Sequence, residues 1–300
     1  MARCLVSFGA NIGDPWSTIQ SAAARLQDLL CDVPSGSSSD LTSFQLSRCF
    51  RTPPVGGPTG QPPFINAVAA IETPASPWEV WHCVRGVEKE FGRERNLRWE
   101  ARRIDLDILL YDEIRVWTPH LKIPHPRMCM RRFILLPAVD VAPDWVDPVS
   151  SWTIGQLADN VRHGPSNFIL LANESSNPES LLAEVARRTG AQWRSNNENR
   201  HRSEHWADGR WVSVASKLED IVGASASKLL IALAPKVSAT DVAWEDYHRS
   251  IASRMGLLAD GAANVFAPGP RYLLANDDRE WAVQELVAAL EAMDCPIEAL

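Results

Sequence analysis

Two aspartates, Asp105 and Asp107, stand two positions apart in the apolar stretch RIDLDILLYD. In a β-strand, side chains at positions i and i+2 point to the same face, roughly 6.6 Å apart along the chain. Two carboxylates on one face can share hard cations such as Mg²⁺, which prefers oxygen ligands and substrate phosphates. Ile104, Leu106 and Ile108 would anchor the opposite face in the core. The pattern predicts a metal site, and a half-exposed strand whose acids face water is the alternative.

The segment just before these acids is rich in arginine: Arg93, Arg95, Arg98, Arg102 and Arg103. Guanidinium groups bind phosphate through two hydrogen bonds and stay charged, so arginines next to metal-binding acids can form a phosphate clamp. Trp99 lies within the same segment. A basic surface loop is the competing interpretation for the arginines taken alone.

A second candidate site is the Pro- and Gly-rich loop RTPPVGGPTGQPPFIN, which carries Thr52, Phe64 and Asn66. A rigid loop can direct backbone N–H and C=O groups toward a flat heterocycle, with an aromatic ring to stack on and an amide to recognise its edge. Further along, IPHPRM contains His125. Taken separately, the loop also fits an ordinary connection, and a lone histidine is usually structural.

Hydrophobic patterns predict the elements that position these residues. Strands are expected at 3–9, 44–52, 64–73 and 103–112, and amphipathic helices at 16–30 and 76–92. Strands interleaved with two helices indicate an α/β (α+β) fold, with a ferredoxin-like α/β/α sandwich of βαββαβ order as the expected topology.

The pattern restarts at residue 166, which suggests a second, smaller α/β domain. A strand followed by a loop is expected in NFILLANESS, residues 167–176, a second strand at 228–235, and helices at 178–190, 243–256 and 278–293. A chain of 300 residues suits roughly two domains, at ~100–200 residues each. We therefore predict domains at 1–163 and 166–300, with one large domain as the alternative.

Composition narrows the functional classes. The net charge of −7 argues against an electrostatic surface for nucleic acid or anionic membranes. The six cysteines form no CxxC pair and no zinc or disulfide spacing, which is typical of reduced thiols. No stretch reaches the ~18 apolar residues of a membrane span, and the N-terminus does not read as a signal peptide. A cytoplasmic location is expected.

Taken together and in this order, six segments closely resemble the 6-hydroxymethyl-7,8-dihydropterin pyrophosphokinase family. They are FGANIGDP, RTPPVGGPTGQPPFINAV, VEKEFGRER, RWEARRIDLDILLYD, IPHPRM and RRFILLPAVDVAPDW, and the resemblance covers residues 3 to about 160. It implies a ferredoxin-like fold and transfer of diphosphate from ATP to the hydroxymethyl group of the dihydropterin. AMP would be released, Mg²⁺ would be the cofactor, and folate biosynthesis the pathway.

The resemblance also implies roles for individual residues. Asp105 and Asp107 match metal-binding acids. The residues that match the pterin pocket are Thr52, Pro53, Val55, Phe64, Asn66 and Phe133. The residues that match catalytic and phosphate-binding positions of the family are Arg93, Arg95, Arg98, Trp99, Arg102 and Asp107. The residues that match its ATP contacts are Glu88, Arg102, Ile108, His125 and Arg131. Asn11 lines the first turn.

The second half carries only a faint resemblance, to deoxynucleoside kinases. The sequence ANESSNPES stands where GxxxxGK[ST] would be needed, without the glycine pair and the lysine that bind phosphates. A degenerate kinase-like domain and an unrelated α/β appendage are both open. Two further hypotheses are a non-catalytic pterin- or nucleotide-binding scaffold protein and a bifunctional enzyme with nucleoside kinase activity.

Overall fold

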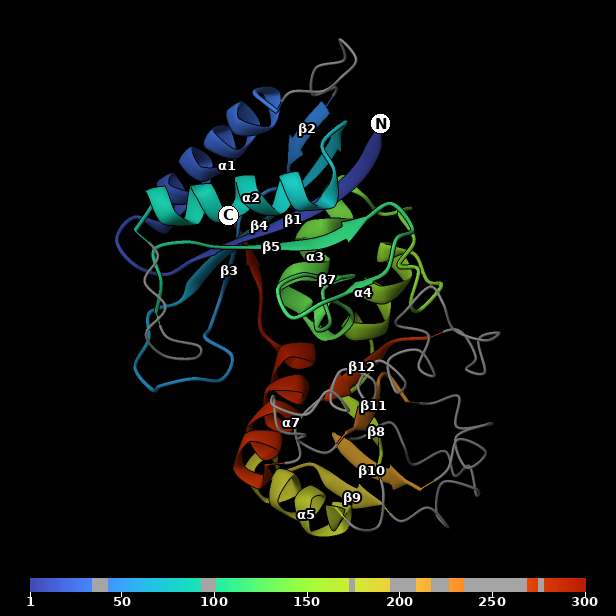
Figure 1. Ribbon diagram of the computed structural model, residues 1–300. Coiled ribbons are helices and arrows are strands. Elements are labelled where there is room, and N and C mark those ends of the chain that lie inside the picture. Colours follow the sequence, from blue (N-terminus) through green and yellow to red (C-terminus); the bar gives the residue numbers. More distant parts are fainter. Residues whose placement is uncertain are drawn as a thin grey trace. The chain divides into compact units, whose positions relative to one another are not determined.

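The computed structural model describes residues 1–33, 43–92, 101–172, 176–194, 209–216, 227–234, 269–274 and 278–300. The chain divides into two compact units, shown in Figure 1. The first comprises Met1–Pro148, Thr153–Ala158 and Cys295–Leu300, and the second Val149–Trp152 and Asp159–Asp294. The segment Cys295–Leu300, which the sequence analysis grouped with the second domain, is thus part of the first unit.

An antiparallel sheet forms the framework of the first unit. Its strand order is β13-β3-β4-β1-β5, and β2 also pairs with β4. The elements that build it are β1 (Ala2–Ala10), α1 (Pro15–Cys31), β2 (Ser43–Leu46), β3 (Phe50–Thr52), β4 (Phe64–Thr73), α2 (Pro77–Glu90), β5 (Asp105–Tyr111) and β13 (Glu298–Ala299). The path β1-α1-β3-β4-α2-β5, with β1 between β4 and β5, is the expected ferredoxin-like arrangement.

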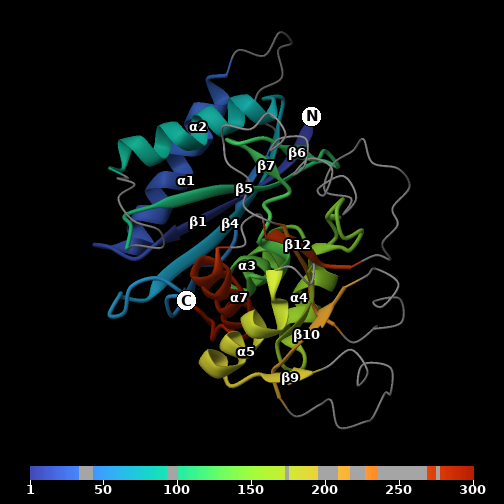
Figure 2. The same ribbon diagram turned by 60° about the horizontal axis from the view of Figure 1, so that its bottom comes forward.

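Helices cover both faces of this sheet (Figures 1 and 2). Helices α1 and α2 lie on one face, and α3 (Arg132–Val141) lies on the other. On β1, Val6 and Phe8 are buried in one cluster with Ile19 of α1 and Val84 of α2. Because side chains alternate along a strand, Ser7 and Gly9 must face the side of α3.

The two long helices begin where the sequence predicts them, because each has a side-chain cap. The carboxylate of Asp14 accepts a hydrogen bond from the Ser17 N–H at 3.1 Å at the start of α1. A capping box starts α2: the Glu79 N–H donates to the Ser76 hydroxyl, and the Ser76 N–H donates to the Glu79 carboxylate. Such caps satisfy backbone donors that a helix cannot pair internally.

The single strand predicted at 44–52 is wrong, because the structure divides it into β2 and β3. The pairing of β2 with β4 aligns Leu46 with Ala69, and that of β3 aligns Phe50 with Asn66, so the register shifts by one residue. At the break, the Ser47 N–H donates to the Val68 carbonyl at 2.8 Å, and the Val68 N–H donates to the Ser47 hydroxyl at 3.0 Å. Ser47 thus bridges an irregularity of the β-bulge type.

Short elements complete the first unit after β5. They are a hairpin of β6 (Val116–Trp117) and β7 (Lys122–Ile123), the 3₁₀ turn η1 (Met128–Met130), helix α3, and helix α4 (Ile154–Arg162). The chain passes from the first unit to the second within α4, between Ala158 and Asp159.

The described strands of the second unit form a parallel sheet in the order β12-β11-β8-β10-β9. Its elements are β8 (Asn167–Leu171), α5 (Pro178–Thr189), β9 (Gln192–Arg194), β10 (Trp211–Ala215), β11 (Leu230–Leu233), β12 (Arg271–Leu274) and α7 (Arg279–Asp294). Strand β8 is central, and its near-continuous burial is typical of a parallel strand covered on both faces.

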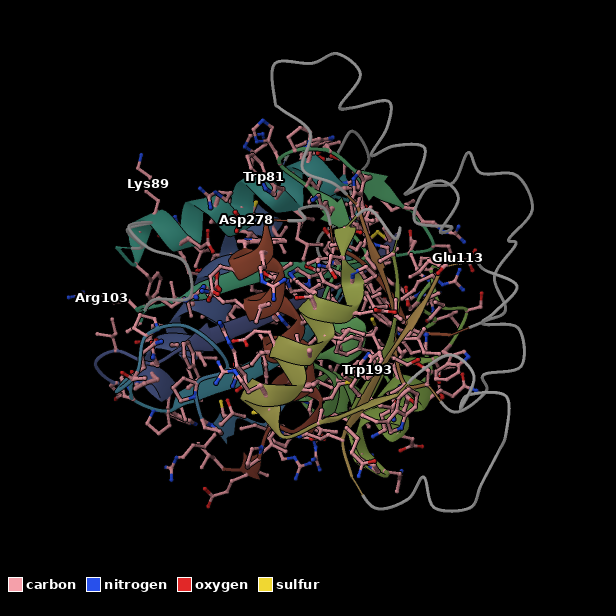
Figure 3. All side chains as sticks on the ribbon, turned by 90° about the horizontal axis from the view of Figure 1, so that it is seen from below. Trp81, Lys89, Arg103, Glu113, Trp193 and Asp278 are labelled. Carbon is pink, nitrogen blue, oxygen red and sulfur yellow. The ribbon has the colours of Figure 1, made fainter. Side chains whose placement is uncertain are left out.

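Three strands of this sheet, β9, β10 and β12, were missed from the sequence, because polar or loop-like residues surround each short apolar run. Trp211 of β10 is buried, whereas Trp193 of β9, labelled in Figure 3, is largely exposed. Trp206 and the helix expected at 243–256 lie outside the described residues. None of the helices in the described ranges has the length and apolar character that a membrane span requires.

Candidate active site

The candidate site lies on the sheet face opposite α1 and α2, where three strands meet side by side. Gly9 of β1 aligns with Asn66 of β4 on one side and with Asp105 of β5 on the other. Residues directly opposite in an antiparallel pair point to the same face, and neighbouring strands are ~4.8 Å apart. Asn66, which is expected to bind the pterin, and Asp105, which is expected to bind a metal, are therefore about two strand spacings apart. Gly9 lies between them and has no side chain.

The two acids of β5 lie as the alternation predicts. Asp105 and Asp107 are partly exposed, while Leu106 and Ile108 are buried. The Ser7 hydroxyl on β1 donates to the Asp107 backbone carbonyl at 3.4 Å and joins the two strands next to the acids. Ile108 belongs to the core on the opposite face. The side chain of Ile108 therefore faces away from the acids, so the ATP contact expected for this residue stays a prediction that would involve its backbone.

Glu88, which the resemblance assigned to ATP, is buried beneath the acids. Its carboxylate accepts a hydrogen bond from the Leu106 N–H at 3.0 Å and pairs with Arg85 at 2.9 Å. Leu106 stands between the two aspartates on a sheet edge, so Glu88 fixes the backbone from which both acids project. The geometry of Glu88 favours a positioning role over direct contact with a nucleotide.

We expect Glu88→Ala to lower the free energy of unfolding by about 1–3 kcal/mol, because it leaves the buried Leu106 N–H without an acceptor. Glu88→Gln keeps an acceptor oxygen and loses the ion pair with Arg85, so a smaller decrease is expected. Urea unfolding of the two variants and the wild type measures the difference. Equal stability of the alanine and glutamine variants would contradict the role of the hydrogen bond.

Arg102 is the described member of the arginine cluster that reaches an acid. Its guanidinium pairs with the Asp105 carboxylate. Arg103, in contrast, is exposed, and its side chain extends outward from the ribbon (Figure 3), so its part in the expected clamp stays a prediction. The remaining predicted residues of this segment, Arg93, Arg95, Arg98 and Trp99, lie outside the described residues.

Asn11 connects three segments of the site. Its side-chain carbonyl accepts a hydrogen bond from the Arg102 N–H at 2.8 Å, and its amide donates to the Pro62 carbonyl at 3.2 Å. Its own backbone N–H donates to the Arg102 carbonyl at 3.1 Å. The sequence analysis placed Asn11 in the first turn but missed this function. No sequence signal indicates it, because the partners are 51 and 91 positions away.

A basic segment lies beside Asp107. Nε2 of His125 is 3.6 Å from the Asp107 carboxylate, and the Arg131 guanidinium is 3.9 Å from the same oxygen. The backbone N–H of Arg127 donates to Nδ1 of His125 at 3.1 Å. In the neutral ring, Nδ1 is therefore the acceptor and Nε2 carries the proton toward Asp107.

Burial, together with the cations Arg131 and Arg127, holds the pKa of His125 well below its ordinary value. His125 is therefore neutral at pH 7, and its Nε2 lies 3.6 Å from the Asp107 carboxylate. The positive charge next to Asp107 comes from Arg131, whose guanidinium also lies over the ring of Phe133, 5.6 Å from its centroid. The pair of Arg131 and Phe133 connects the expected phosphate region with the expected pterin pocket.

The residues expected to hold the pterin gather around the end of β3. The Asn66 amide donates to the Thr52 hydroxyl at 2.8 Å, and both side chains are buried. Val55, Phe64 and Phe133 are partly exposed, and Pro53 is exposed. A hydrogen bond between two buried polar groups fixes the orientation of the amide, which leaves its carbonyl oxygen on the side of Gly9, 3.4 Å from an ideal Cβ position there.

The acids fit a hard cation that shares its coordination with a substrate. Within the described residues, no group of three or more His, Cys, Asp or Glu side chains is placed to hold a metal. Two carboxylates on one face are nevertheless a suitable donor set for Mg²⁺, which keeps several waters and takes substrate phosphates as ligands. Arg102 shares Asp105 in this arrangement and would have to share the carboxylate with the ion.

Comparisons with known proteins identify the family of this chain. The family model described as 7,8-dihydro-6-hydroxymethylpterin-pyrophosphokinase matches residues 5–143. Similar proteins named 2-amino-4-hydroxy-6-hydroxymethyldihydropteridine pyrophosphokinase occur in Synechocystis and Pseudomonas aeruginosa. The first is 36% identical over 157 residues, covering 52% of this chain and 75% of the relative. The second is 37% identical over 142 residues, covering 47% and 82%.

A relative of the same name from Porphyromonas gingivalis is 34% identical over 152 residues, which cover 49% of this chain and 95% of the relative. The matched length corresponds to about one half of this chain and most of each relative. This chain belongs to the 7,8-dihydro-6-hydroxymethylpterin-pyrophosphokinase family.

Proposed function

We propose that this chain transfers diphosphate from ATP to the hydroxymethyl group of 6-hydroxymethyl-7,8-dihydropterin and releases AMP, as a step of folate biosynthesis. Membership of the family supports the reaction class, and the curated relatives carry the corresponding name. The observation that carries the proposal is the row formed by Asn66, Gly9 and Asp105. It places an amide that could recognise the heterocycle and an acid that could bind a metal on one sheet face, with no side chain between them.

In this proposal the pterin binds next to the pair of Thr52 and Asn66, with Phe64 and Phe133 as aromatic contacts and Pro53 and Val55 at the loop. ATP phosphates bind near Asp105, Asp107, Arg102 and Arg131, with His125 as a neutral donor. The residues Arg93, Arg95, Arg98 and Trp99 belong to the same proposal on the basis of the sequence alone. Phosphoryl-type transfer depends chiefly on positioning and charge neutralisation, which such groups supply.

Asp105 and Asp107 would hold Mg²⁺, and the ion would neutralise phosphate charge when bound. The protein contributes the fixed backbone of β5, which Glu88 and Ser7 hold from two sides. Arg131, 3.9 Å from the Asp107 carboxylate, adds positive charge of its own at this position. We propose no single side chain as an obligatory general base.

The second unit has no assigned ligand in this proposal. Its parallel sheet supports an α/β domain at 166–294, and the kinase-like ancestry inferred from sequence stays a prediction. The absence of a phosphate-binding lysine in ANESSNPES disfavours a second kinase activity. A cytoplasmic location also stays a prediction, supported by the thiol content and composition.

The test is a coupled assay of AMP release by the full chain with ATP, Mg²⁺ and 6-hydroxymethyl-7,8-dihydropterin. AMP release that depends on the pterin is expected. If the folded chain binds ATP but forms no AMP with the pterin, the transferase proposal fails and the non-catalytic scaffold hypothesis takes its place. The full chain is required, because a fragment that ends before residue 295 lacks β13 of the first unit.

A further inference from the structure

The sheet that carries the candidate site ends in a strand from the opposite end of the sequence. Strand β13 pairs antiparallel with β3, which aligns Glu298 with Arg51 and Ala299 with Phe50. The backbone N–H of Leu300 donates to the Cys49 carbonyl at 2.9 Å. Cys295 is buried, and the segment Cys295–Leu300 belongs to the first compact unit. Figures 1 and 2 show this segment leaving α7.

Strand β3 is short and lies between two other strands of the sheet. It consists of Phe50–Thr52 and pairs with β4 on one side, while β13 is its partner on the other. An edge strand this short would leave backbone N–H and C=O groups unpaired along its outer side without β13. Pairing on both sides converts β3 from an edge strand into an interior strand.

The position of β3 matters because it ends in Thr52. The Thr52 hydroxyl accepts the hydrogen bond that orients the Asn66 amide, at 2.8 Å. In an antiparallel sheet, successive residues direct their backbone groups to alternate neighbours. The hydrogen bond from Leu300 to Cys49 shows which residues of β3 direct their backbone groups toward β13. The backbone groups of Arg51 face Glu298 of β13, whereas those of Phe50 and Thr52 face β4. Arg51 and Thr52 are therefore held by different strands.

We propose that residues 295–300 are a positioning element of the pterin site, and that they act through backbone pairing with β3. This inference rests on the proposed function, since it assigns Thr52 and Asn66 to the pterin. The side chains of β13 contribute little: Glu298 and Ala299 are exposed, and the Arg51–Glu298 ion pair is 3.5 Å long between exposed groups. The pairing should therefore tolerate side-chain changes but not loss of a backbone N–H.

The chain enters this segment directly from a helix end that is itself anchored. Asp294, the last residue of α7, accepts hydrogen bonds from the Ser166 hydroxyl and the Arg210 guanidinium, both at 2.6 Å and both within the second unit. The next residue, Cys295, begins the segment that belongs to the first unit. The end of α7 is therefore held within the second unit, and β13 is held within the first by its own pairing with β3.

Proline substitutions separate backbone pairing from general damage, because proline has no backbone N–H. Leu300→Pro removes the N–H that donates to Cys49, and Glu298→Pro removes the N–H that faces Arg51. Ala299→Pro is the matched control, because the alternation directs the Ala299 N–H away from β3. Glu298→Gln is a second control that removes the ion pair and keeps the backbone.

We expect Leu300→Pro and Glu298→Pro each to raise KM for the dihydropterin about 3–10-fold, the loss of roughly one hydrogen bond. KM for ATP should stay unchanged, and both controls should resemble the wild type. Amide hydrogen exchange at Arg51 and Thr52 should become faster in the same two variants. A purely structural role would instead lower stability and affect the two substrates equally.

The proposal is overturned if the two test variants keep the pterin KM and exchange rates of the wild type, or if Ala299→Pro is affected as strongly as they are. Equilibrium binding of the dihydropterin separates this outcome from failure of the proposed function. If the wild type binds the pterin but releases no AMP, only the proposed transfer fails, and the same comparison is made on pterin affinity. If the wild type binds no pterin, both proposals fail.

Discussion

Replacing Asp107 by asparagine is expected to lower kcat about 10²–10³-fold, the range found when one preorganised electrostatic group is removed from an active site. An asparagine side chain has nearly the same size and shape as aspartate but no negative charge. The decrease in kcat would therefore measure the contribution of the negative charge and of metal binding. The fold should persist, because β5 is held at this point by the Ser7 hydroxyl on the Asp107 backbone carbonyl and by Glu88 on Leu106.

The measurement is steady-state AMP release at saturating ATP and pterin, together with thermal unfolding. Asp144→Asn is the matched control: it makes the same chemical change at an exposed position of the first unit. We expect this control to keep wild-type turnover. Turnover of Asp107→Asn within about threefold of the control would remove Asp107 from the catalytic groups, and with it the metal assignment.

Replacing Gly9 by valine is expected to lower kcat/KM about 100-fold or more. Gly9 separates Asn66 from Asp105 in the central strand. Under the proposed function, the missing side chain at this position leaves room for the pterin hydroxymethyl group to meet the phosphates. A branched side chain would fill this space, and displacement of reacting atoms by about 1 Å can by itself reduce the rate 10²-fold.

Valine suits a β-strand, so this substitution separates occlusion of the site from unfolding. Gly9→Ala is the graded comparison. Its Cβ would be 3.4 Å from the Asn66 side-chain oxygen, close to ordinary contact, so a smaller decrease is expected. Far-ultraviolet circular dichroism and urea unfolding check the fold of both variants. An active Gly9→Val variant with kcat/KM near that of the wild type would show that reaction does not occur across this strand.

Because His125 is neutral, it adds no positive charge to the site. With its pKa held low by burial and by neighbouring arginines, His125 adds a hydrogen-bond donor without adding a cation. Among the described residues, the positive charge next to Asp107 then comes from Arg131, and that next to Asp105 comes from Arg102. Such a division keeps the cations on residues that stay protonated at every physiological pH.

The sequence by itself determined the local features of this protein. The alternation in RIDLDILLYD correctly places both acids on one face and Leu106 and Ile108 on the other, because strand periodicity is a property of consecutive residues. The caps at Asp14 and Ser76 set the helix starts for the same reason. The combined motifs also sufficed to identify the family.

Only the tertiary structure decided how distant segments meet. The row of Asn66, Gly9 and Asp105 depends on strand register, and the contacts of Asn11 and Glu88 join segments that are far apart along the chain or belong to different elements. The division of β2 from β3 depends on a one-residue register shift. Above all, β13 belongs to the first unit because unpaired backbone groups of β3 accept it, and backbone pairing leaves no mark in the sequence.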